Sequence, residues 1–268
     1  MELVVNGYST YCYTGSRAFD PAKPTVVFIH GVLNDHSVWI LQTRYLANHG
    51  WNVLAPDLPG HAKSAGKAPA TVQEAAAFVL ALLDAAGVAR AALVGHSFGS
   101  LIALELAAHA PTRVSHLVLA GTAYPMKVTA ALLDAALHAP QKAIEMVNVF
   151  SHSTLAPPPS SLGPGTWVYG GSRALMRRVL ASNRAENLFH IGFLACDRYA
   201  DGEAAMKLVQ TPTLFILGSK DQMAPVKAAQ ALVGWARNAR VVQVDAGHQM
   251  MVEAPDAVLV ALRDFLAQ

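Results

Sequence analysis

Cysteine is scarce in this sequence of 268 residues, which holds only Cys12 and Cys196. The two lie far apart and neither belongs to a C-x-x-C pair, so they do not form a disulfide framework. We interpret them as reduced, buried thiols. The sequence also lacks a metal-ligand cluster and a nucleotide-binding glycine loop, and it therefore predicts neither a metal nor another cofactor.

Charged residues are few, at 14 % of the chain, and the formal net charge is only +2. No run of Lys and Arg is long enough for a nucleic-acid or lipid-headgroup surface, so we expect neither partner. No stretch approaches 18 uninterrupted apolar residues, which predicts no membrane span. The start, Met1 to Val5, resembles a strand and lacks the features of a signal peptide, so we expect a cytoplasmic protein. The sequence indicates no particular oligomeric state.

Hydrophobic residues, in contrast, make up 53 % of the chain, enough for one domain with a large core. Apolar runs rich in β-branched residues alternate with helical patterns, which predicts a mostly parallel sheet with helices on both faces. The expected strands are 4–5, 11–13, 25–30, 52–55, 91–94, 118–120, 213–217 and 241–244. The expected helices of these layers are 39–48, 71–86, 98–108, 225–237 and 255–267.

Between residues 124 and 207 the alternation stops. The expected helices there are 128–138, 141–152, 172–182 and 186–199, with a loop rich in Pro, Gly and Ser over 156–166. We therefore divide the chain into a core, residues 1–123 and 208–268, and an α-helical cap, or lid, inserted as residues 124–207. Open α/β sheets bind ligands at the carboxyl edge of their strands, and we expect the cap at that edge.

The clearest motif is Gly95-His96-Ser97-Phe98-Gly99, which directly follows a predicted strand and begins a predicted helix. In this context G-x-S-x-G indicates a nucleophile elbow, a tight and strained turn that exposes the serine above the sheet. The two glycines leave room for the turn, and the serine Oγ then projects at the positive end of the helix. We predict Ser97 as a nucleophile.

A serine nucleophile needs a base, and in folds with this elbow the chain order is Ser, then Asp or Glu, then His. His248 follows the last predicted strand, in a loop that can reach Ser97. Asp221 lies just past the strand 213–217, whereas the loop after 118–120 carries no carboxylate and Asp245 is too close to His248 in sequence. We predict that His248 is the general base and that Asp221 orients it.

A tetrahedral intermediate needs hydrogen-bond donors for its oxyanion. One predicted donor is the backbone N–H of Phe98, next to the nucleophile. The other is the backbone N–H of Val32, in the loop after the strand that ends at His30.

Taken together, the motifs resemble those of capped α/β-hydrolases of the bacterial esterase, lactonase and carbon–carbon hydrolase group. The matching pieces are Phe28-Ile29-His30-Gly31 with Trp39, Asp57 to His61 with Ser64, the elbow, Gly218 to Asp221 with Pro225, and Gly247-His248 with Glu253 and Pro255. The resemblance implies the α/β-hydrolase fold and cleavage of a small or medium apolar carboxylic ester, a lactone or a thioester, through an acyl-enzyme. Serine as nucleophile argues against carbon–halogen and epoxide cleavage, for which relatives use Asp. Ser100 stands where many relatives have a second glycine.

The cap contributes bulky apolar residues that we expect in a hydrophobic acyl or alcohol pocket, although each could instead pack the cap onto the core. The candidates on the cap are Met146, Phe150, Trp167, Tyr169 and Phe193, with Phe189 and Tyr199 beside them. Met250 and Met251, just after His248, are expected to line the same pocket.

Two alternative functions remain compatible with the sequence besides ester hydrolysis. One is a related reaction, perhydrolysis of the haloperoxidase type or carbon–carbon bond cleavage, and the other is a ligand receptor with slow turnover. Carbon–carbon hydrolases resemble Gly-Asn-Ser at the elbow and carry polar cap residues, whereas this chain has Gly95-His96-Ser97 and a mostly apolar cap. Ester hydrolysis therefore ranks first.

The assignment of His248 as base predicts a pH dependence. We expect ester hydrolysis to rise as His248 loses its proton around neutral pH, because only the neutral imidazole can accept the proton of Ser97. A rate that stays constant from pH 5 to pH 9 would contradict this role.

Overall fold

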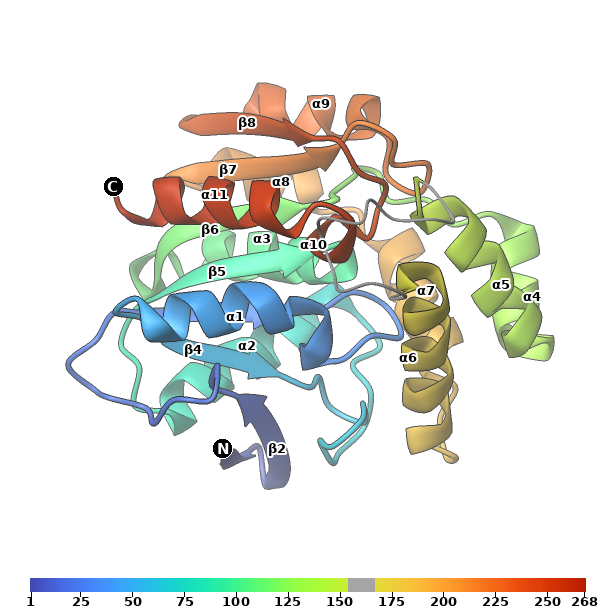
Figure 1. The fold of residues 1–268 in the computed structure, drawn as a ribbon, viewed down its shortest axis with the longest axis horizontal. Helices are drawn as coiled ribbons and strands as arrows, with labels where there is room; N and C mark the ends of the chain where they lie inside the picture. The colour runs from blue at the N-terminus through green and yellow to red at the C-terminus, as the bar shows by residue number, and fades with distance from the viewer. Residues whose placement is uncertain (154–166) are drawn as a thin grey trace.

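The computed structural model describes residues 1–153 and 167–268. An eight-stranded sheet crosses the middle of this part of the chain in the order β1-β2-β4-β3-β5-β6-β7-β8 (Figure 1). The strands are β1 (Glu2–Val5), β2 (Tyr8–Tyr13), β3 (Thr25–Ile29), β4 (Asn52–Pro56), β5 (Ala91–His96), β6 (Val114–Ala120), β7 (Thr213–Gly218) and β8 (Ala239–Val244). β2 is antiparallel to both β1 and β4, and the other pairs are parallel.

Helices cover both faces of the sheet, which confirms the predicted α/β class. One face carries α2 (Val72–Ala85), α3 (Phe98–His109) and α9 (Val226–Trp235), and the other carries α1 (Ile40–Asn48) and α11 (Pro255–Leu266). Short 3-10 helices span His36–Trp39 and Pro111–Arg113. No helix among the described residues is both long and apolar enough to cross a membrane.

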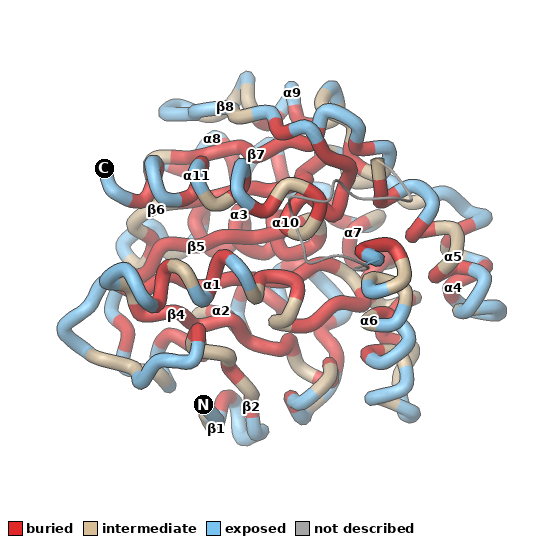
Figure 2. Tube along the Cα trace, in the orientation of Figure 1, coloured by how far each residue is buried: buried red, intermediate tan, exposed pale blue. Residues whose placement is uncertain are grey.

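The central strands are buried on both faces, as Figure 2 shows for β5 and its neighbours. In β3, Val27 and Ile29 pack beneath α2 and α3, while Val26 and Phe28 pack on the opposite side toward α1 and α11. Successive side chains of a strand point to opposite faces, so a strand between two helical layers needs an unbroken apolar run. This requirement explains why the run Thr25–Ile29 predicted a buried strand.

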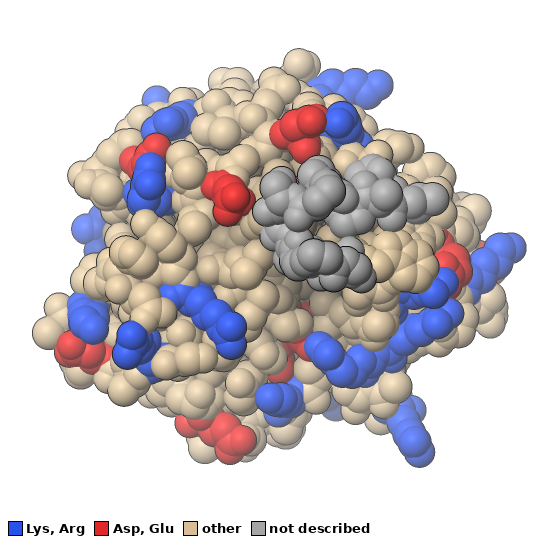
Figure 3. Space-filling view, in the orientation of Figure 1, with Lys and Arg blue, Asp and Glu red and all other residues tan. Residues whose placement is uncertain are grey.

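Four inserted helices follow β6 and precede β7: α4 (Ala130–His138), α5 (Pro140–Ser151), α6 (Val168–Ser182) and α7 (Leu188–Arg198). Figure 1 places them beyond the carboxyl ends of the central strands. Their apolar faces form one cluster that also takes in Leu33, from the loop after β3. Lys and Arg side chains gather over α6 in Figure 3, where Arg178 pairs with Asp35 at 2.7 Å and so joins α6 to the same loop.

Two short helices were not predicted: α8 (Gly202–Leu208) and α10 (Met250–Glu253). Ala205 and Met206 of α8 pack into the cluster formed by α2, α3 and α9, so α8 belongs to the layer on the sheet. We therefore propose that the cap ends before Gly202, whereas the sequence-based division placed its end at residue 207. The predicted loop over 156–166 lies outside the described residues.

The central sheet predicts where the chain is most sensitive to loss of volume. Leu93 on β5 is fully buried, and Leu93→Ala should lower the free energy of unfolding by about 2–5 kcal/mol through lost burial and a cavity. The matched control is Leu137→Ala on α4, where the side chain is 45 % exposed and the change should stay within about 0.5 kcal/mol. Denaturant unfolding measures both, and equal losses would contradict the assignment of the core.

Candidate active site

Ser97 occupies the sharp turn between β5 and α3. Its backbone angles, φ 53° and ψ −118°, lie in a region that residues other than glycine rarely adopt. Such a conformation costs of order 1–3 kcal/mol and persists only where the surrounding structure enforces it. Here the Ser97 N–H donates to the carbonyl of Ala120 on β6 at 2.9 Å. The side chain is held out of the helix at the carboxyl edge of the sheet.

The glycines of the elbow are required by the crossing of β5 and α3. A Cβ on Gly95 would collide with the carbonyl of Gly99, and a Cβ on Gly99 would collide with the carbonyl of Ile29 on β3. Ser100, which replaces the second glycine of many relatives, donates its hydroxyl to the Ser97 carbonyl at 2.5 Å and contacts Thr122 Oγ1 at 2.8 Å. Ser100 therefore ties the turn to the end of β6.

His248 and Asp221 meet across two loops at the same edge. His248 Nδ1 lies 2.7 Å from Asp221 Oδ2, and both residues are buried. The other oxygen of Asp221 accepts the backbone N–H groups of Met223 and Ala224, each at 2.8 Å. Asp221 follows β7 and His248 follows β8, so parallel strands bring residues 27 positions apart together.

The electrostatic setting keeps Asp221 ionised. Burial acts to raise the pKa of Asp221, but the charge and hydrogen bond of His248 and the N–H of Ala224 hold that pKa below its ordinary value. An ionised Asp221 requires a proton on His248 Nδ1, which leaves Nε2 as the nitrogen free to accept a proton.

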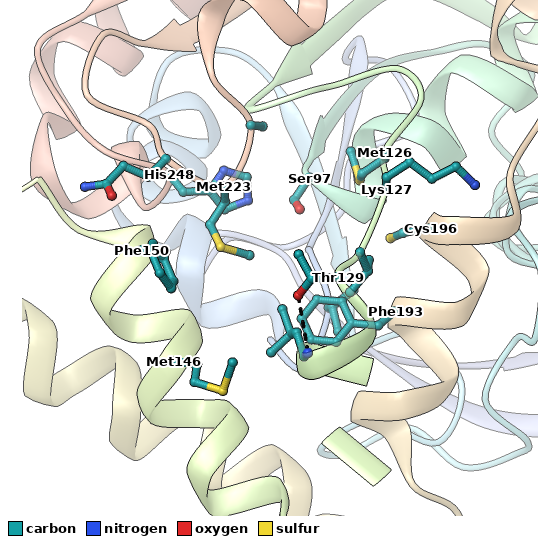
Figure 4. A pocket seen from close by; sticks show the side chains of 15 residues that line it. Ser97, Met126, Lys127, Thr129, Met146, Phe150, Phe193, Cys196, Met223 and His248 are labelled. Atoms are coloured by element: carbon teal, nitrogen blue, oxygen red, sulfur yellow. Dashed lines mark hydrogen bonds between the residues drawn. The ribbon is translucent and has the colours of Figure 1, made fainter. Parts of the chain in front are cut away.

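Ser97 and His248 line one hollow, which we call the main cavity. It measures about 230 Å³, and its apolar wall includes Met146, Phe150, Phe193 and Met223. Figure 4 shows the side chains of Ser97 and His248 facing the same space, with Met146 and Phe150 reaching in from α5 and Phe193 from α7. In the described part of the chain no direct hydrogen bond joins Ser97 Oγ to His248, a separation that free hydrolases often have.

The predicted oxyanion donors lie on either side of Ser97. Phe98 is the first residue of α3, so its N–H has no acceptor within the helix. Val32 lines the main cavity together with Ser97. The loop that holds Val32 passes close to the serine, because a Cβ on Gly31 would lie 3.2 Å from Ser97 Cβ.

Three of the six predicted pocket residues line the main cavity: Met146, Phe150 and Phe193. Three lie elsewhere. Trp167 is 48 % exposed and stacks on Tyr169, and Trp167 borders a separate hollow near Val38. Tyr169 is buried between Trp167 and His152.

Met250 is fully buried in the core between the sheet and α11, as is Met251, because α10 begins directly after the His248 loop and turns both side chains inward. Of the further candidates, Tyr199 is also buried away from the cavity and donates its hydroxyl to Glu105 at 2.7 Å. Sequence position alone did not separate these core residues from cavity residues.

Comparison with known proteins identifies the family. A family model described as the alpha/beta hydrolase fold matches residues 24–255, which is most of the chain. The chain belongs to the α/β-hydrolase fold family.

Curated relatives of this α/β-hydrolase carry several names. It is 30 % identical to a 2-hydroxymuconate semialdehyde hydrolase of Pseudomonas sp. (strain CF600), over 100 % of this chain and 93 % of the relative. It is 29 % identical to a pimeloyl-[acyl-carrier protein] methyl ester esterase of Aromatoleum aromaticum, over 90 % of this chain and 98 % of the relative. The enol-lactonase of Burkholderia xenovorans LB400 shares the fold, with a TM-score of 0.83 over 100 % of both chains and 24 % identity.

Two longer relatives match only in part. Both are dihydrolipoyllysine-residue acetyltransferase components of acetoin cleaving systems. The chain spans 24 % of the protein from Cupriavidus necator, at 42 % identity over 91 residues. It spans 63 % of the protein from Pseudomonas putida, at 30 % identity over 256 residues.

One trio of described residues, Asp35, His36 and Asp57, places possible metal-ligating atoms within 4.8 Å of one another. These atoms are already engaged within the protein. Asp57 accepts the backbone N–H of His36 and contacts His36 Nδ1 at 2.7 Å, and Asp35 binds Ser37 and Arg178. We therefore interpret the trio as a structural anchor for the loop after β3.

Sequence reasoning assigned no role to Glu253, although it noted this residue as part of a family motif. One carboxylate oxygen accepts the N–H of Gly247 at 2.6 Å, and the other accepts the N–H and hydroxyl of Ser153 at 2.8 and 2.9 Å. Glu253 thus joins the His248 loop to the segment that follows α5. Met223 also lines the main cavity, which was not predicted from the sequence. Its position two residues after Asp221, in the loop at the carboxyl edge of the sheet, could have indicated this.

These contacts predict that Glu253 stabilises the loop. Glu253→Ala should lower the free energy of unfolding by about 1–3 kcal/mol, because it leaves the buried Gly247 N–H without an acceptor. Asp264→Ala, on the exposed side of α11 beside Arg263, is the matched control and should change stability by less than about 0.5 kcal/mol. Thermal unfolding of the two variants with equal midpoints would contradict the assignment.

Proposed function

We propose that this α/β-hydrolase is a serine hydrolase that cleaves a small or medium apolar carboxylic ester, including lactones and thioesters, through an acyl-enzyme intermediate. The observation that carries the proposal is the strained turn at Ser97, which opens into one apolar cavity with His248, itself bonded to Asp221 at 2.7 Å. A half-buried serine held in place by a strained turn, with an oriented imidazole in the same cavity to act as base, is the arrangement that activates a hydroxyl.

The first half of the reaction follows from these positions. Ser97 Oγ attacks the ester carbonyl carbon while His248 Nε2 takes the hydroxyl proton, and Asp221 stabilises the imidazolium that forms. The carbonyl oxygen becomes an oxyanion, which the N–H groups of Val32 and Phe98 stabilise, with each such donor contributing about 3–4 kcal/mol in related enzymes. The bond to the alcohol oxygen then breaks, and the alcohol leaves with the proton from His248.

The second half repeats the chemistry with water. His248 accepts a proton from water as the water oxygen attacks the acyl carbon. The bond between that carbon and Ser97 Oγ then breaks, and the acid leaves as His248 returns the proton to Ser97. None of these steps calls for a metal or another cofactor. The inserted helices α4 to α7 act as a cap that supplies Met146, Phe150 and Phe193 to the acyl or alcohol pocket.

Carbon–carbon bond hydrolysis is a second candidate. It is favoured by the match to a 2-hydroxymuconate semialdehyde hydrolase over the whole chain. Against it stand the elbow His96 and the mainly apolar wall of the main cavity, in which Lys127, Thr129 and Gln222 are the polar members besides Ser97 and His248. A vinylogous diketone that is turned over faster than every ester in a chain-length series would select this candidate.

The decisive experiment is labelling with an organophosphonate ester probe, read by intact-protein mass. We expect one adduct on the wild type, located on the peptide that contains Ser97, and none on Ser97→Ala. Hydrolysis of p-nitrophenyl esters should fall by at least about 10⁴-fold in Ser97→Ala.

Two further outcomes complete the test. Ser172→Ala, on α6 and outside the main cavity, is the matched control and should still be labelled. A wild-type protein that neither takes the label nor cleaves an ester would overturn the proposal and favour a ligand receptor.

A further inference from the structure

A second, smaller hollow also borders Ser97, and we call it the recess. It measures about 20 Å³, close to the space of one water molecule. Its wall includes Asn34, His96, Ser151 and Gln249, together with Ser97 and His248. The two reacting side chains therefore border both the large apolar main cavity and this small recess.

Three residues that line the recess carry buried polar atoms without hydrogen-bond partners. Seven buried side-chain nitrogen or oxygen atoms of the described residues lack a hydrogen bond, and six of them belong to five residues. Three of the five, Asn34, His96 and Ser151, line the recess, whereas the other two, Asn148 and His152, do not. Each is at least nine-tenths buried. An unpaired buried polar atom costs about 1–3 kcal/mol, so such a concentration beside a reacting serine indicates a binding function.

The hydrogen-bonding character of His96 is defined by its other nitrogen. His96 Nε2 lies 2.9 Å from the carbonyl of His248, so Nε2 carries the proton and Nδ1 is an acceptor. Burial and the nearby charge of His248 lower the pKa of His96 to about 3, which keeps the ring neutral. The Asn34 amide and the Ser151 hydroxyl can each donate or accept a hydrogen bond. The recess therefore offers one group that can only accept, His96 Nδ1, beside two groups that can do either.

The absence of charged side chains from the recess restricts the charge of a group that could bind there. The residues that line the recess include no Lys, Arg, Asp or Glu. A carboxylate would enter without a cation to compensate its lost hydration, and an ammonium group would enter without an anion. A neutral hydroxyl fits both the size and the pattern, because it donates to His96 Nδ1 and accepts from the Ser151 hydroxyl.

We propose that the recess binds a hydroxyl group of the substrate, so that the enzyme acts on hydroxy-substituted esters with one apolar arm and one short polar arm. This inference rests on the proposed ester hydrolysis at Ser97. The carbon that Ser97 attacks carries two arms, the acyl chain and the alkoxy group. The main cavity takes the apolar arm, and the recess takes the hydroxyl group of the short polar arm. The hydroxyl lies on the acyl chain or on the alcohol, and the test below separates these two sources.

The test uses two pairs of esters in which a hydroxyl replaces a methyl group of similar size. The first pair, 2-hydroxyethyl hexanoate and propyl hexanoate, places the hydroxyl on the alcohol. The second pair, hexyl 2-hydroxypropanoate and hexyl 2-methylpropanoate, places it on the acyl chain. Acid release at constant pH gives kcat/KM for all four esters. In one pair we expect the hydroxy ester to be preferred by at least about tenfold.

Ser151→Ala should reduce that preference, the ratio of kcat/KM for the hydroxy ester to that for its methyl counterpart, at least about fivefold. The matched control is Ser172→Ala on the neighbouring helix α6, which is outside the recess and should keep the full preference. Equal rates within both pairs for the wild type would overturn the inference, and the recess would then hold only water. A preference that survives in Ser151→Ala would also overturn it.

A binding measurement separates this inference from the proposed function. Calorimetry on Ser97→Ala, which keeps the recess but cannot form an acyl-enzyme, should give tighter binding of the hydroxy ester in the preferred pair by at least about threefold. Tighter binding with no hydrolysis by the wild type would support the recess and overturn the ester hydrolase. Equal binding within both pairs would overturn the recess whether or not esters are cleaved.

Discussion

The site depends on one tight crossing, where β5 ends and α3 begins. The chain must reverse its direction within Ser97, and the helix must start against the backbone of β3. Only glycine at positions 95 and 99 allows the backbones to come this close, and the result is a serine with φ 53°. The Ser97 N–H bond to Ala120 and the Ser100 hydroxyl hold this conformation. Packing against the sheet therefore keeps Ser97 in its strained conformation. This conformation directs the serine side chain toward the inserted helices.

The surroundings of the serine divide into two unlike parts. On one side lies the main cavity, with thioether and aromatic side chains from α5 and α7. On the other lies the recess, where Asn34, His96 and Ser151 present polar atoms that no described residue satisfies. Helix α5 contributes to both parts, because Met146 and Phe150 face one side and Ser151 the other. Rotation along a helix of 3.6 residues per turn lets one element line both parts.

The His248 loop is the link between the core and α5. Glu253 accepts the Gly247 N–H and binds Ser153, and the N–H of Gln249 donates to the carbonyl of Ser151 at 3.1 Å. The imidazole and the end of α5 therefore share a set of hydrogen bonds. The same residues that position His248 also position Ser151 beside the recess. The same short stretch of backbone therefore joins the His248 loop to one wall of the recess.

The sequence by itself determined the α/β layers and the serine elbow, because both depend on local rules. Unbroken apolar runs such as 25–29 require burial on two faces, and a G-x-S-x-G between a strand and a helix has few alternatives. His248 and Asp221 could be chosen from chain order and from their places after strands, and the structure brings them within 2.7 Å.

Tertiary structure alone decided which apolar residues line the main cavity. Met250 and Met146 look equivalent in sequence, yet α10 turns Met250 into the core while α5 turns Met146 into the main cavity. The unpaired atoms of His96 and Ser151 were equally invisible, since a missing hydrogen bond exists only between elements that are distant in the chain. Local pattern encodes burial, whereas the direction in which a buried side chain points depends on how separate elements pack.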